Sequence, residues 1–350
     1  MTEESDLVVG SATRLFTNHC LHEVLLAAED GTWPEALWRA VEDAGFPLAL
    51  VPEGAGGSGL PVAEAFRLVR VAAMYSAPIP LAETMLAACL LADGAIPVPQ
   101  GPLSIAPTNR GDRVVLARRD NGWHLSGTVT RVPWARRAAG LVVVLEEGNR
   151  KVAVLAKPGA GTVMPGTNLA AEPRDDVAFD IDLPQEAVAP LASDFDLRAW
   201  GAAMRTAQIA GALNQILETT VRYAGERSQF GRPIGKFQAV QQNLAVLAGQ
   251  VAAATAAADI AADAIATTGD ALAIASAKLR AGEAAGIGAA IAHQVHGAIG
   301  FTQEYGLHFS TRRLWSWRDE FGSESEWASL IGTRVAAEGA DRLWATITNI

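Results

Sequence analysis

Hydrophobic residues change their spacing along the chain, and the changes predict separate regions. From Glu3 to Ala95 apolar positions recur every three or four residues, as at Leu21, Val24 and Leu25, with glycine and proline between the runs. Such spacing places the apolar residues on one face of a helix. The first region is therefore predicted to be helical.

Between Gly101 and Pro190 the apolar residues form short runs that are rich in β-branched side chains. Two of these runs flank the turn Asp120-Asn121-Gly122, and the stretch from Val177 to Leu183 alternates apolar residues with small or acidic ones. Asn-Gly turns join antiparallel strands, and alternation with a period of two is typical of a half-buried strand. Strands without helices between them predict a small β-barrel or sandwich.

From Asp194 onward proline is nearly absent, and long alanine-rich stretches follow helical spacing. Alanine has the highest helix propensity and little bulk, so helices built from it approach one another closely. The uncharged stretch from Phe237 to Ala258 is long enough to cross a bilayer, but its polar amide side chains favour a buried helix of a soluble protein. The expected fold is multi-domain α+β, with an N-terminal helical domain (residues 1–98), a small β domain (99–192) and a C-terminal helical bundle (193–350).

Composition narrows the possible functions. The 350 residues include 28 Lys+Arg and 38 Asp+Glu, which gives a net charge of -10. This charge repels phosphate polymers and anionic membranes, so we expect neither nucleic-acid binding nor membrane insertion. Cys20 and Cys89 are too few for a disulfide framework or a zinc cage. The acidic start of the chain lacks the basic and apolar parts of a targeting peptide, so a cytoplasmic location is expected.

Two groups of residues look like known sites but lack a necessary part. Gly54–Gly59 matches G-x-G-x-x-G, yet two residues separate it from the preceding apolar run, and we predict a surface turn between helices. His19, Cys20 and His22 lie on one short segment without a second cluster of ligands. No metal site is expected there.

The most informative segment runs from Arg227 to Gln238, a turn with glycine and proline between two helical stretches. A guanidinium suits a pyrophosphate, and the Phe230-Gly231 turn lets the backbone approach a ligand closely. A second segment, from Gln294 to Phe301, exposes backbone amides beside a glutamine. On physical grounds alone, an ordinary turn between helices is the favoured interpretation of the first segment, and each segment by itself is weak evidence for a ligand site.

Together, these two segments and the order of the regions before them resemble the acyl-CoA dehydrogenase family. The resemblance covers nearly the whole chain and is strongest from Ala207 to Phe301. It implies a helical domain, a middle β-barrel and a C-terminal four-helix bundle, in the order derived above. It also implies FAD, bound between the middle domain of one subunit and the bundle of its neighbour, an acyl-CoA substrate and an electron-transfer flavoprotein as acceptor.

The resemblance assigns the cofactor-binding residues to segments that one subunit lends to its neighbour: Arg227, Phe230, Gln238, Gln294, Gly297 and Ala298. The arginine would contact the pyrophosphate, the phenylalanine would pack near the cofactor, and Gln238 would approach it from the next helix. Gln294 and Gly297 would receive the adenosine diphosphate portion. At Ala298 a methyl group stands where the family has a second glycine.

The residues that serve a subunit's own flavin and its own chemistry depart from the family pattern. The catalytic carboxylate of one family branch falls on Phe321, and that of the other branch falls on Gly201; neither residue can accept a proton. Glu320 is the remaining candidate for the base. Leu103–Asn109 replaces the acidic, glycine-containing flavin stretch, and Arg131–Pro133 replaces a Trp-Ile-Thr/Ser motif.

This division predicts the non-catalytic subunit of a heteromeric acyl-CoA dehydrogenase. The chain would share FAD with a related catalytic subunit in an α2β2 assembly, and it resembles subunits that act on bulky esters such as sterol side-chain intermediates. Two alternatives stay open. One is a self-sufficient homomeric dehydrogenase that uses Glu320 as its base, and the other is a scaffold that binds no flavin.

Overall fold

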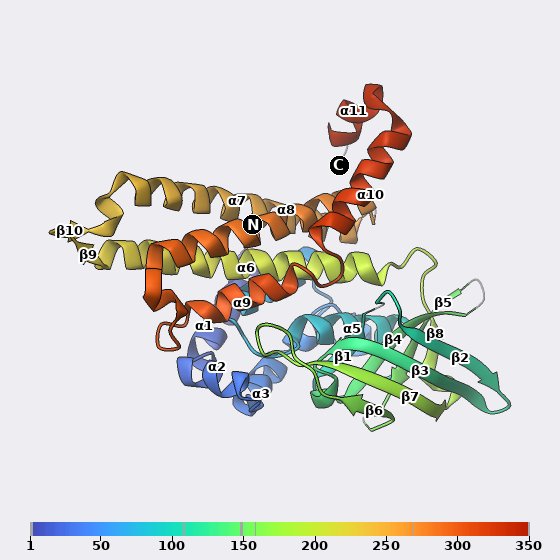
Figure 1. Ribbon diagram of the computed structural model, residues 1–350. Helices are drawn as coiled ribbons and strands as arrows, with labels where there is room; N and C mark the ends of the chain where they lie inside the picture. Colours follow the sequence, from blue (N-terminus) through green and yellow to red (C-terminus); the bar gives the residue numbers. More distant parts are fainter. Residues whose placement is uncertain (1–2, 108, 148–149, 158, 268, 349–350) are drawn as a thin grey trace. The chain divides into compact units, whose positions relative to one another are not determined.

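The computed structural model describes residues 3–107, 109–147, 150–157, 159–267 and 269–348 (Figure 1). They form two compact units. The helical unit comprises Met1–Leu25, Phe66–Ala77 and Ala199–Ile350, and the β unit comprises Leu26–Ala65 and Pro78–Arg198. The order of elements confirms an α+β fold with helical N- and C-terminal regions and a β region between them. The domain boundaries at 98/99 and 192/193 stay predictions.

The β unit contains two four-stranded sheets among its described residues. Its strands are β1 (Leu103–Ala106), β2 (Arg113–Arg119), β3 (Gly122–Pro133), β4 (Gly140–Glu147), β5 (Arg150–Ala156), β6 (Gly161–Met164), β7 (Arg174–Leu183) and β8 (Val188–Pro190). One sheet has the order β1-β4-β5-β8 and the other β2-β3-β7-β6. The described pairs are antiparallel, except that β1 and β4 run parallel. The expected small β fold is therefore present.

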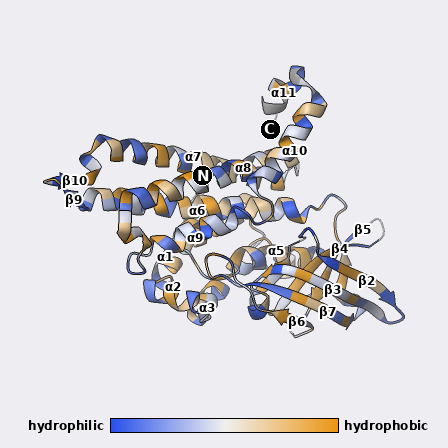
Figure 2. Cartoon of the chain, viewed as in Figure 1, coloured by the Kyte–Doolittle hydropathy of each residue, from blue (hydrophilic) through white to orange (hydrophobic). Residues whose placement is uncertain are grey.

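Residues from both sheets form one hydrophobic core in this unit. Leu125 and Phe179 come from one sheet, whereas Val143 and Val154 come from the other, and all four are buried. Figure 2 shows hydrophobic residues along the strands of both sheets. The predicted alternation from 177 to 183 lies within β7, where burial alternates along most of the strand.

The described part of the β unit also contains helices and short 3₁₀ turns. They include α3 (Glu35–Asp43), α5 (Leu81–Asp93), η1 (Phe46–Leu48), η2 (Glu53–Ala55), η3 (Ala135–Arg137) and η4 (Gln185–Ala187). The glycine segment 54–59 forms a tight turn, because a Cβ on Gly57 would lie 2.1 Å from the Val51 carbonyl oxygen. The turn lies between helical elements, as predicted.

Helices of different lengths build the helical unit. They are α1 (Glu3–His19), the start of α2 (His22–Glu29), the end of α4 (Val62–Met74), α6 (Leu197–Glu226), α7 (Gln238–Ala266), α8 (Ala271–His296), α9 (Leu307–Trp317), α10 (Glu324–Glu338) and α11 (Leu343–Thr348). Small residues let them meet closely. A Cβ on Gly211 of α6 would lie 2.1 Å from the Arg70 carbonyl oxygen of α4, and one on Gly288 of α8 would lie 2.6 Å from Leu213 of α6.

The two alanine-rich helices differ in burial. Residues along the whole length of α8 are buried, including Ala275, Ala285 and Ala292. Among the described helices, α7 is long and apolar enough to cross a membrane by length and composition, and 33% of its most apolar stretch is buried. The prediction of a buried helix over 237–258 is therefore wrong for the outer face of α7. Alanine is compatible with a buried or an exposed helix face, so composition does not separate these cases.

Candidate functional site

A short hairpin follows α6. Its strands are β9 (Ser228–Gln229) and β10 (Arg232–Pro233), and Phe230 with Gly231 forms the turn. The φ angles of these two residues are 50° and 79°, in a region that glycine adopts readily and phenylalanine seldom does. Left-handed backbone at a non-glycine residue often marks a functional turn.

The hairpin exposes the side chain at its tip. Phe230 is 92% exposed, although its ring meets the Phe237 ring edge-on with 6.1 Å between centroids. The Arg232 guanidinium lies 4.3 Å from the centroid of Phe237. These contacts stabilise the hairpin without covering it. An aromatic side chain is thus available to another molecule.

The C-terminal end of α8 provides a second exposed backbone segment. Gly297 has φ 62° and ψ -142°, and no atom lies within 4 Å of the position where its Cβ would be. Gln294 and Ala298 are exposed on either side of it. The neighbouring Phe301 is 69% exposed. The backbone of this turn is therefore open to a ligand. Ala298 is exposed, so its methyl group is not packed in the protein interior.

Tyr223 connects these two segments. Its hydroxyl donates to the His296 carbonyl oxygen at 3.4 Å, its ring stacks on His296 with 4.5 Å between centroids, and its own carbonyl accepts from Arg227 N at 2.8 Å. The contacts hold the hairpin and the end of α8 at one end of the bundle (Figure 1). No sequence motif marks Tyr223, although its position one helical turn before Arg227 was a signal.

His296 is neutral in this arrangement. Its Nδ1 lies 2.7 Å from the Ala292 carbonyl oxygen, which can only accept, so Nδ1 carries the proton. Nε2 then accepts from the Tyr305 hydroxyl at 3.2 Å. Burial lowers the pKa of His296, which agrees with a neutral ring.

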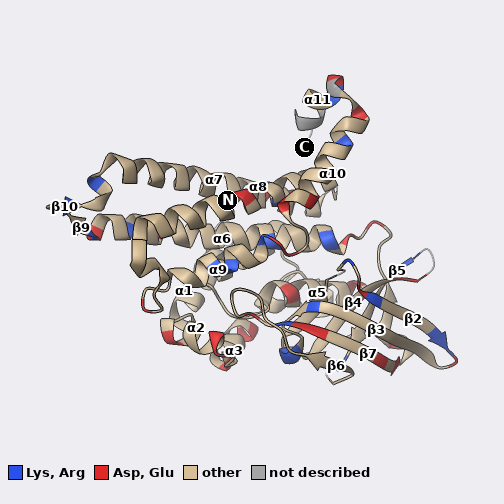
Figure 3. Cartoon of the chain, viewed as in Figure 1, with Lys and Arg blue, Asp and Glu red and all other residues tan. Residues whose placement is uncertain are grey.

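Positive charge gathers at this end of an acidic chain. The basic residues are Arg222, Arg227, Arg232 and Lys236 (blue in Figure 3 around β9, β10 and the start of α7). Among the described residues, no carboxylate pairs with any of the three guanidiniums, although Glu226 is a sequence neighbour. Unpaired guanidiniums suit a pyrophosphate. All six predicted cofactor-binding residues are exposed, and Tyr223 brings the segments that carry most of them together.

The two positions that the resemblance assigns to the family's catalytic carboxylates, Phe321 and Gly201, meet each other in this chain. Phe321 has φ 56°, and its ring occupies the space above Gly201 at the start of α6. A Cβ on Gly201 would lie 2.1 Å from Cδ1 of that ring. Each position therefore excludes a larger residue at the other.

Glu320, the alternative base, is in a buried ion pair. Arg205 Nε donates to Glu320 Oε2 at 2.7 Å, and the two side chains are 2% and 9% exposed. The same guanidinium lies 5.6 Å from the centroid of the Phe321 ring. A general base needs an oxygen within hydrogen-bond reach of the substrate proton. One oxygen of this carboxylate is already bound to a buried cation.

A buried lysine holds the turn that carries these residues. Lys278 Nζ donates to the carbonyl oxygens of Arg318 and Gly322 at 2.6 and 2.9 Å. Burial lowers the pKa of Lys278 to about 8, and nearby carboxylates, Glu324 first, oppose this shift. Lys278 could not be singled out from the sequence, since one lysine in an alanine-rich helix carries no motif.

In the β unit, Leu103–Asn109 and Arg131–Pro133, which the resemblance aligns with the family's flavin motifs, are hydrogen-bonded to each other and to neighbouring residues. Asn109 Nδ2 donates to the Thr130 carbonyl oxygen at 2.6 Å, and Asp112 Oδ1 accepts from the Thr130 hydroxyl at 2.7 Å. The Ser104 hydroxyl donates to the Pro133 carbonyl oxygen. These polar groups are satisfied within the unit, which leaves fewer of them to hold a cofactor.

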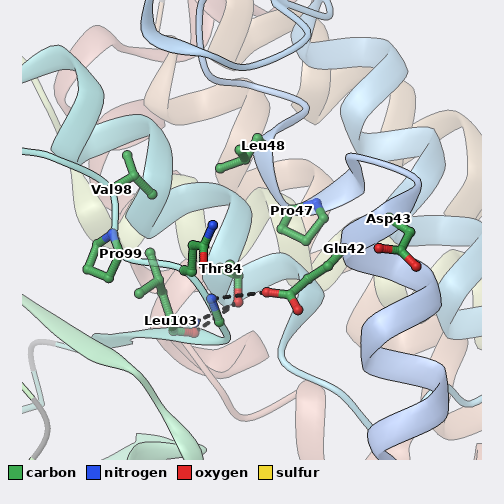
Figure 4. A pocket seen from close by; sticks show the side chains of 10 residues that line it. Glu42, Asp43, Pro47, Leu48, Thr84, Val98, Pro99 and Leu103 are labelled. Atoms are coloured by element: carbon green, nitrogen blue, oxygen red, sulfur yellow. Dashed lines mark hydrogen bonds between the residues drawn. The ribbon is translucent and has the colours of Figure 1, made fainter.

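The β unit also contains a cavity of about 580 Å³ between α3, α5 and the segment before β1 (Figure 4). Glu42 lies at its edge and accepts a hydrogen bond from Gly101 N at 3.0 Å. Thr84 Oγ1 accepts from Leu103 N at 3.0 Å. None of the residues predicted to bind a cofactor or to act as a base lines this cavity.

Comparison with known proteins agrees with the order of elements. Residues 2–95 match the family model described as acyl-CoA dehydrogenase, N-terminal domain, and residues 198–319 match the one described as acyl-CoA dehydrogenase, C-terminal domain. The chain is 31% identical over 316 residues to the acyl-CoA dehydrogenase IpdE2 of Mycobacterium tuberculosis, which covers 89% of this chain and 91% of that protein.

Solved structures share the fold over nearly the whole chain. The ChsE4-ChsE5 complex from Mycobacterium tuberculosis contains a chain with a TM-score of 0.86 and 23% identity, covering 96% of this chain and 98% of that one. A chain of the Tcur3481-Tcur3483 steroid ACAD G363A variant has a TM-score of 0.87 and 26% identity, with the same coverage of 96% and 98%. The first likeness concerns the fold alone.

Proposed function

Because the chain belongs to the acyl-CoA dehydrogenase family, we propose that it is one subunit of an FAD-dependent acyl-CoA dehydrogenase built from two kinds of chain. In this assembly it completes the flavin site of a related catalytic subunit. The family implies FAD as cofactor and an acyl-CoA thioester as substrate. We add that two chains share the flavin site, and that the catalytic base comes from the partner chain.

The proposal depends on one contrast. The residues assigned to the cofactor are exposed, whereas the positions assigned to the catalytic base are filled or paired within the chain. Arg227, Phe230 and Gln294 are exposed on ordered segments, with no carboxylate paired to the arginine. Phe321 fills the space above Gly201, and Glu320 is paired with Arg205. A chain of this kind can bind a cofactor from outside but offers no free base at the positions described for Gly201, Phe321 and Glu320.

Each residue at the cofactor end has a defined task in this proposal. The Arg227 guanidinium neutralises the pyrophosphate, Phe230 covers the cofactor with an apolar face, and Gln238 donates or accepts from the start of α7. Gln294 and the open backbone at Gly297 receive the adenosine diphosphate portion, with Ala298 beside them. When bound, FAD accepts the hydride that leaves the β carbon of the thioester. The carboxylate that removes the α proton belongs to the catalytic partner.

The substrate and the other partners follow from the same reasoning. A chain without a working base leaves the assembly with fewer active sites than chains, which gives room for a bulky acyl group. The similarity to a structure described as a steroid ACAD supports an ester of sterol side-chain size. We propose an α2β2 assembly, with an electron-transfer flavoprotein as electron acceptor.

Flavin content per chain tests the proposal directly. The absorbance of released flavin is measured for the chain purified alone and after co-expression with a related dehydrogenase chain from the same genome. We expect flavin in the co-expressed complex, at about one FAD per pair of chains. A full complement of FAD in the chain alone would favour the homomeric enzyme with Glu320 as base, and flavin-free material with every partner would favour the scaffold.

Arg227→Ala sharpens this experiment. Loss of a charge-assisted contact to a pyrophosphate weakens binding by about 2 kcal/mol or more, so the complex is expected to retain flavin at least tenfold less tightly. The matched control is Arg119→Ala, which removes an exposed arginine of β2 in the β unit. Equal retention in both variants would contradict the assigned role of Arg227.

A further inference from the structure

A buried histidine lies beneath the turn that follows α8. His293 is in the last turn of this helix and is 9% exposed. Its ring stacks on Phe301 with 4.3 Å between centroids and 21° between planes, and on Trp315 of α9 with 5.7 Å and 14°. The exposed Phe301 ring, at the end of the turn, therefore rests on a buried imidazole.

The hydrogen bonds of His293 leave one ring nitrogen without a partner. Nε2 lies 3.0 Å from the Thr311 hydroxyl oxygen, and this hydroxyl donates to the Leu307 carbonyl oxygen at 3.4 Å. Nε2 is therefore the donor to Thr311, and the proton of the neutral ring is on Nε2. Nδ1 is buried and has no hydrogen-bond partner in the described part of the chain.

The backbone of Gly300 covers this nitrogen. A Cβ on Gly300 would lie 3.3 Å from Nδ1 of His293 and 3.0 Å from Cβ of His296, and Gly300 is buried. Solvation of Nδ1 thus requires that the turn from Gly297 to Phe301 lifts away from the end of α8. The geometry couples the position of the turn to the protonation of one imidazole.

The groups around His293 offer little to balance a positive charge. The turn η6 (Gly297–Phe301) has no titratable residue, and α7 carries no charge over residues 238–258. The titratable residues of α9 are all basic: His308, Arg312 and Arg313. On α8 the nearest carboxylate belongs to Glu283, ten residues and about 15 Å along the helix. From α6, Arg222 and Glu226 act on Tyr305. Among the described residues, no carboxylate forms an ion pair with His293.

Protonation of the covered ring is therefore costly. It would create a buried N–H without an acceptor. Burial lowers the pKa of His293, and the neighbouring His296 and His308 lower it further. When the turn lifts, the ring regains the ordinary pKa of an exposed histidine. The covered arrangement is then fully stable above that ordinary value and loses stability as the pH falls below it, because the lifted form binds more protons.

We propose that His293 is a positioning residue that holds the turn from Gly297 to Phe301 in place only while its ring is neutral, so that acid loosens this turn. Gln294 adjoins His293, and Gly297 and Ala298 belong to the turn itself. These residues are assigned to the adenosine diphosphate portion of FAD. An effect of the same proton on flavin retention follows, and this consequence rests on the proposed function.

Hydrogen–deuterium exchange of the full-length chain tests the role of His293 without flavin. Amide exchange of residues 297–302 is measured at pH 7.5 and 5.5 and divided by the rate of an unstructured peptide at each pH. At pH 5.5 an exposed histidine is protonated in about nine of ten molecules, so the normalised rate should rise at least threefold and at most about tenfold.

His293→Gln keeps a donor for Thr311 but does not titrate, and its rate is expected to rise less than twofold. His293→Phe, which keeps a ring to stack on Phe301, should behave in the same way. The control is His19→Gln on α1, which should rise as the wild type does. Equal rates at both pH values in the wild type, or the wild-type rise in both His293 variants, would overturn the proposal.

The co-expressed complex provides a separate test of the consequence for the cofactor. Released flavin is measured after dialysis at pH 7.5 and 5.5, and we expect the wild type to lose at least threefold more flavin at pH 5.5 than the complex with His293→Gln. Equal losses would overturn the link from His293 to the cofactor. A complex without flavin at either pH would contradict the proposed function alone, because the exchange rates test His293 independently.

Discussion

The two ends of α6 differ in how their side chains are satisfied. Gly201 lies near its start and Arg227 follows its end, about 39 Å away at 1.5 Å per residue. Near the start, the Phe321 ring fills the space above the glycine, and Arg205 pairs with Glu320. Near the end, the arginine is exposed and has no carboxylate partner in the described chain.

This contrast separates groups that the chain satisfies internally from groups that it leaves exposed. A buried charge without a partner is costly, and near the start of α6 the pair between Arg205 and Glu320 avoids that cost. Exposed groups carry no such cost and remain available. Whether a polar group is paired within the chain or left exposed therefore indicates whether it stabilises this chain or is available to another molecule.

The largest expected effect comes from breaking the ion pair between Arg205 and Glu320 near the start of α6. Arg205→Leu leaves the Glu320 carboxylate buried without its partner, and removal of one member of a buried pair costs about 3 to 5 kcal/mol. The free energy of unfolding in urea measures this loss. The control is Arg39→Ala, since Arg39 and Glu35 are 70% and 63% exposed and such pairs contribute less than about 1 kcal/mol. Similar losses of stability in both variants would contradict the burial of the pair between Arg205 and Glu320.

The next effect tests the contact between the two base positions. Gly201→Ala drives a methyl group into the Phe321 ring and is expected to cost about 1 to 3 kcal/mol. Phe321→Ala alone costs a similar amount by opening a cavity. Because the new methyl occupies the vacated space, the double variant is expected to lose about 1 to 2 kcal/mol less than the sum.

Urea unfolding of the four proteins measures this coupling. Gly332→Ala in α10 is the control, since no atom lies within 4 Å of its Cβ position, and we expect no loss of stability there. Strict additivity of Gly201→Ala and Phe321→Ala would show that the two positions do not constrain each other.

The sequence predicted the elements better than it predicted these contacts. Periodicity is a local property, so the helical and β regions and the strand within β7 could be found from it. The contact of Phe321 with Gly201 joins segments far apart in the chain, and neither segment's composition specifies the other. The same holds for the carbonyl partners of Lys278. At the cofactor end the six assigned residues stay predictions, and the connecting role of Tyr223 needed the fold.

A smaller effect concerns the contribution of Lys278 to the pH dependence of stability. The pKa of Lys278 is about 8 in the folded chain, against 10.5 for an ordinary lysine. Between these values the unfolded chain binds more protons, so this residue makes stability rise with pH above 8 and contributes no slope below it. From pH 7.5 to 9.5 the gain is about 2 kcal/mol.

Urea unfolding at both pH values measures this slope, and Lys278→Met is expected to lack it. The comparison with this variant is necessary because Cys20 and Cys89 act in the opposite direction. Burial raises the pKa of both thiols from 9.0 to about 12, which lowers stability above pH 9. The same slope in Lys278→Met and in the wild type would show that burial does not lower the pKa of this lysine.

The smallest expected effect is at the C-terminal end of α6, where Tyr223 contacts the end of α8. Tyr223→Phe removes the hydroxyl that donates to the His296 carbonyl oxygen at 3.4 Å and keeps the ring stacked on the imidazole. A hydrogen bond of this length contributes about 0.5 kcal/mol, so stability should change little and flavin retention in the complex should fall about twofold. Tyr223→Ala also removes the stack, and it should lower retention further because Arg227 and the end of α8 are then no longer held together. Released flavin per complex measures both variants, and equal retention in Tyr223→Ala and the wild type would show that the hairpin and the turn at Gly297 keep their places without this tyrosine.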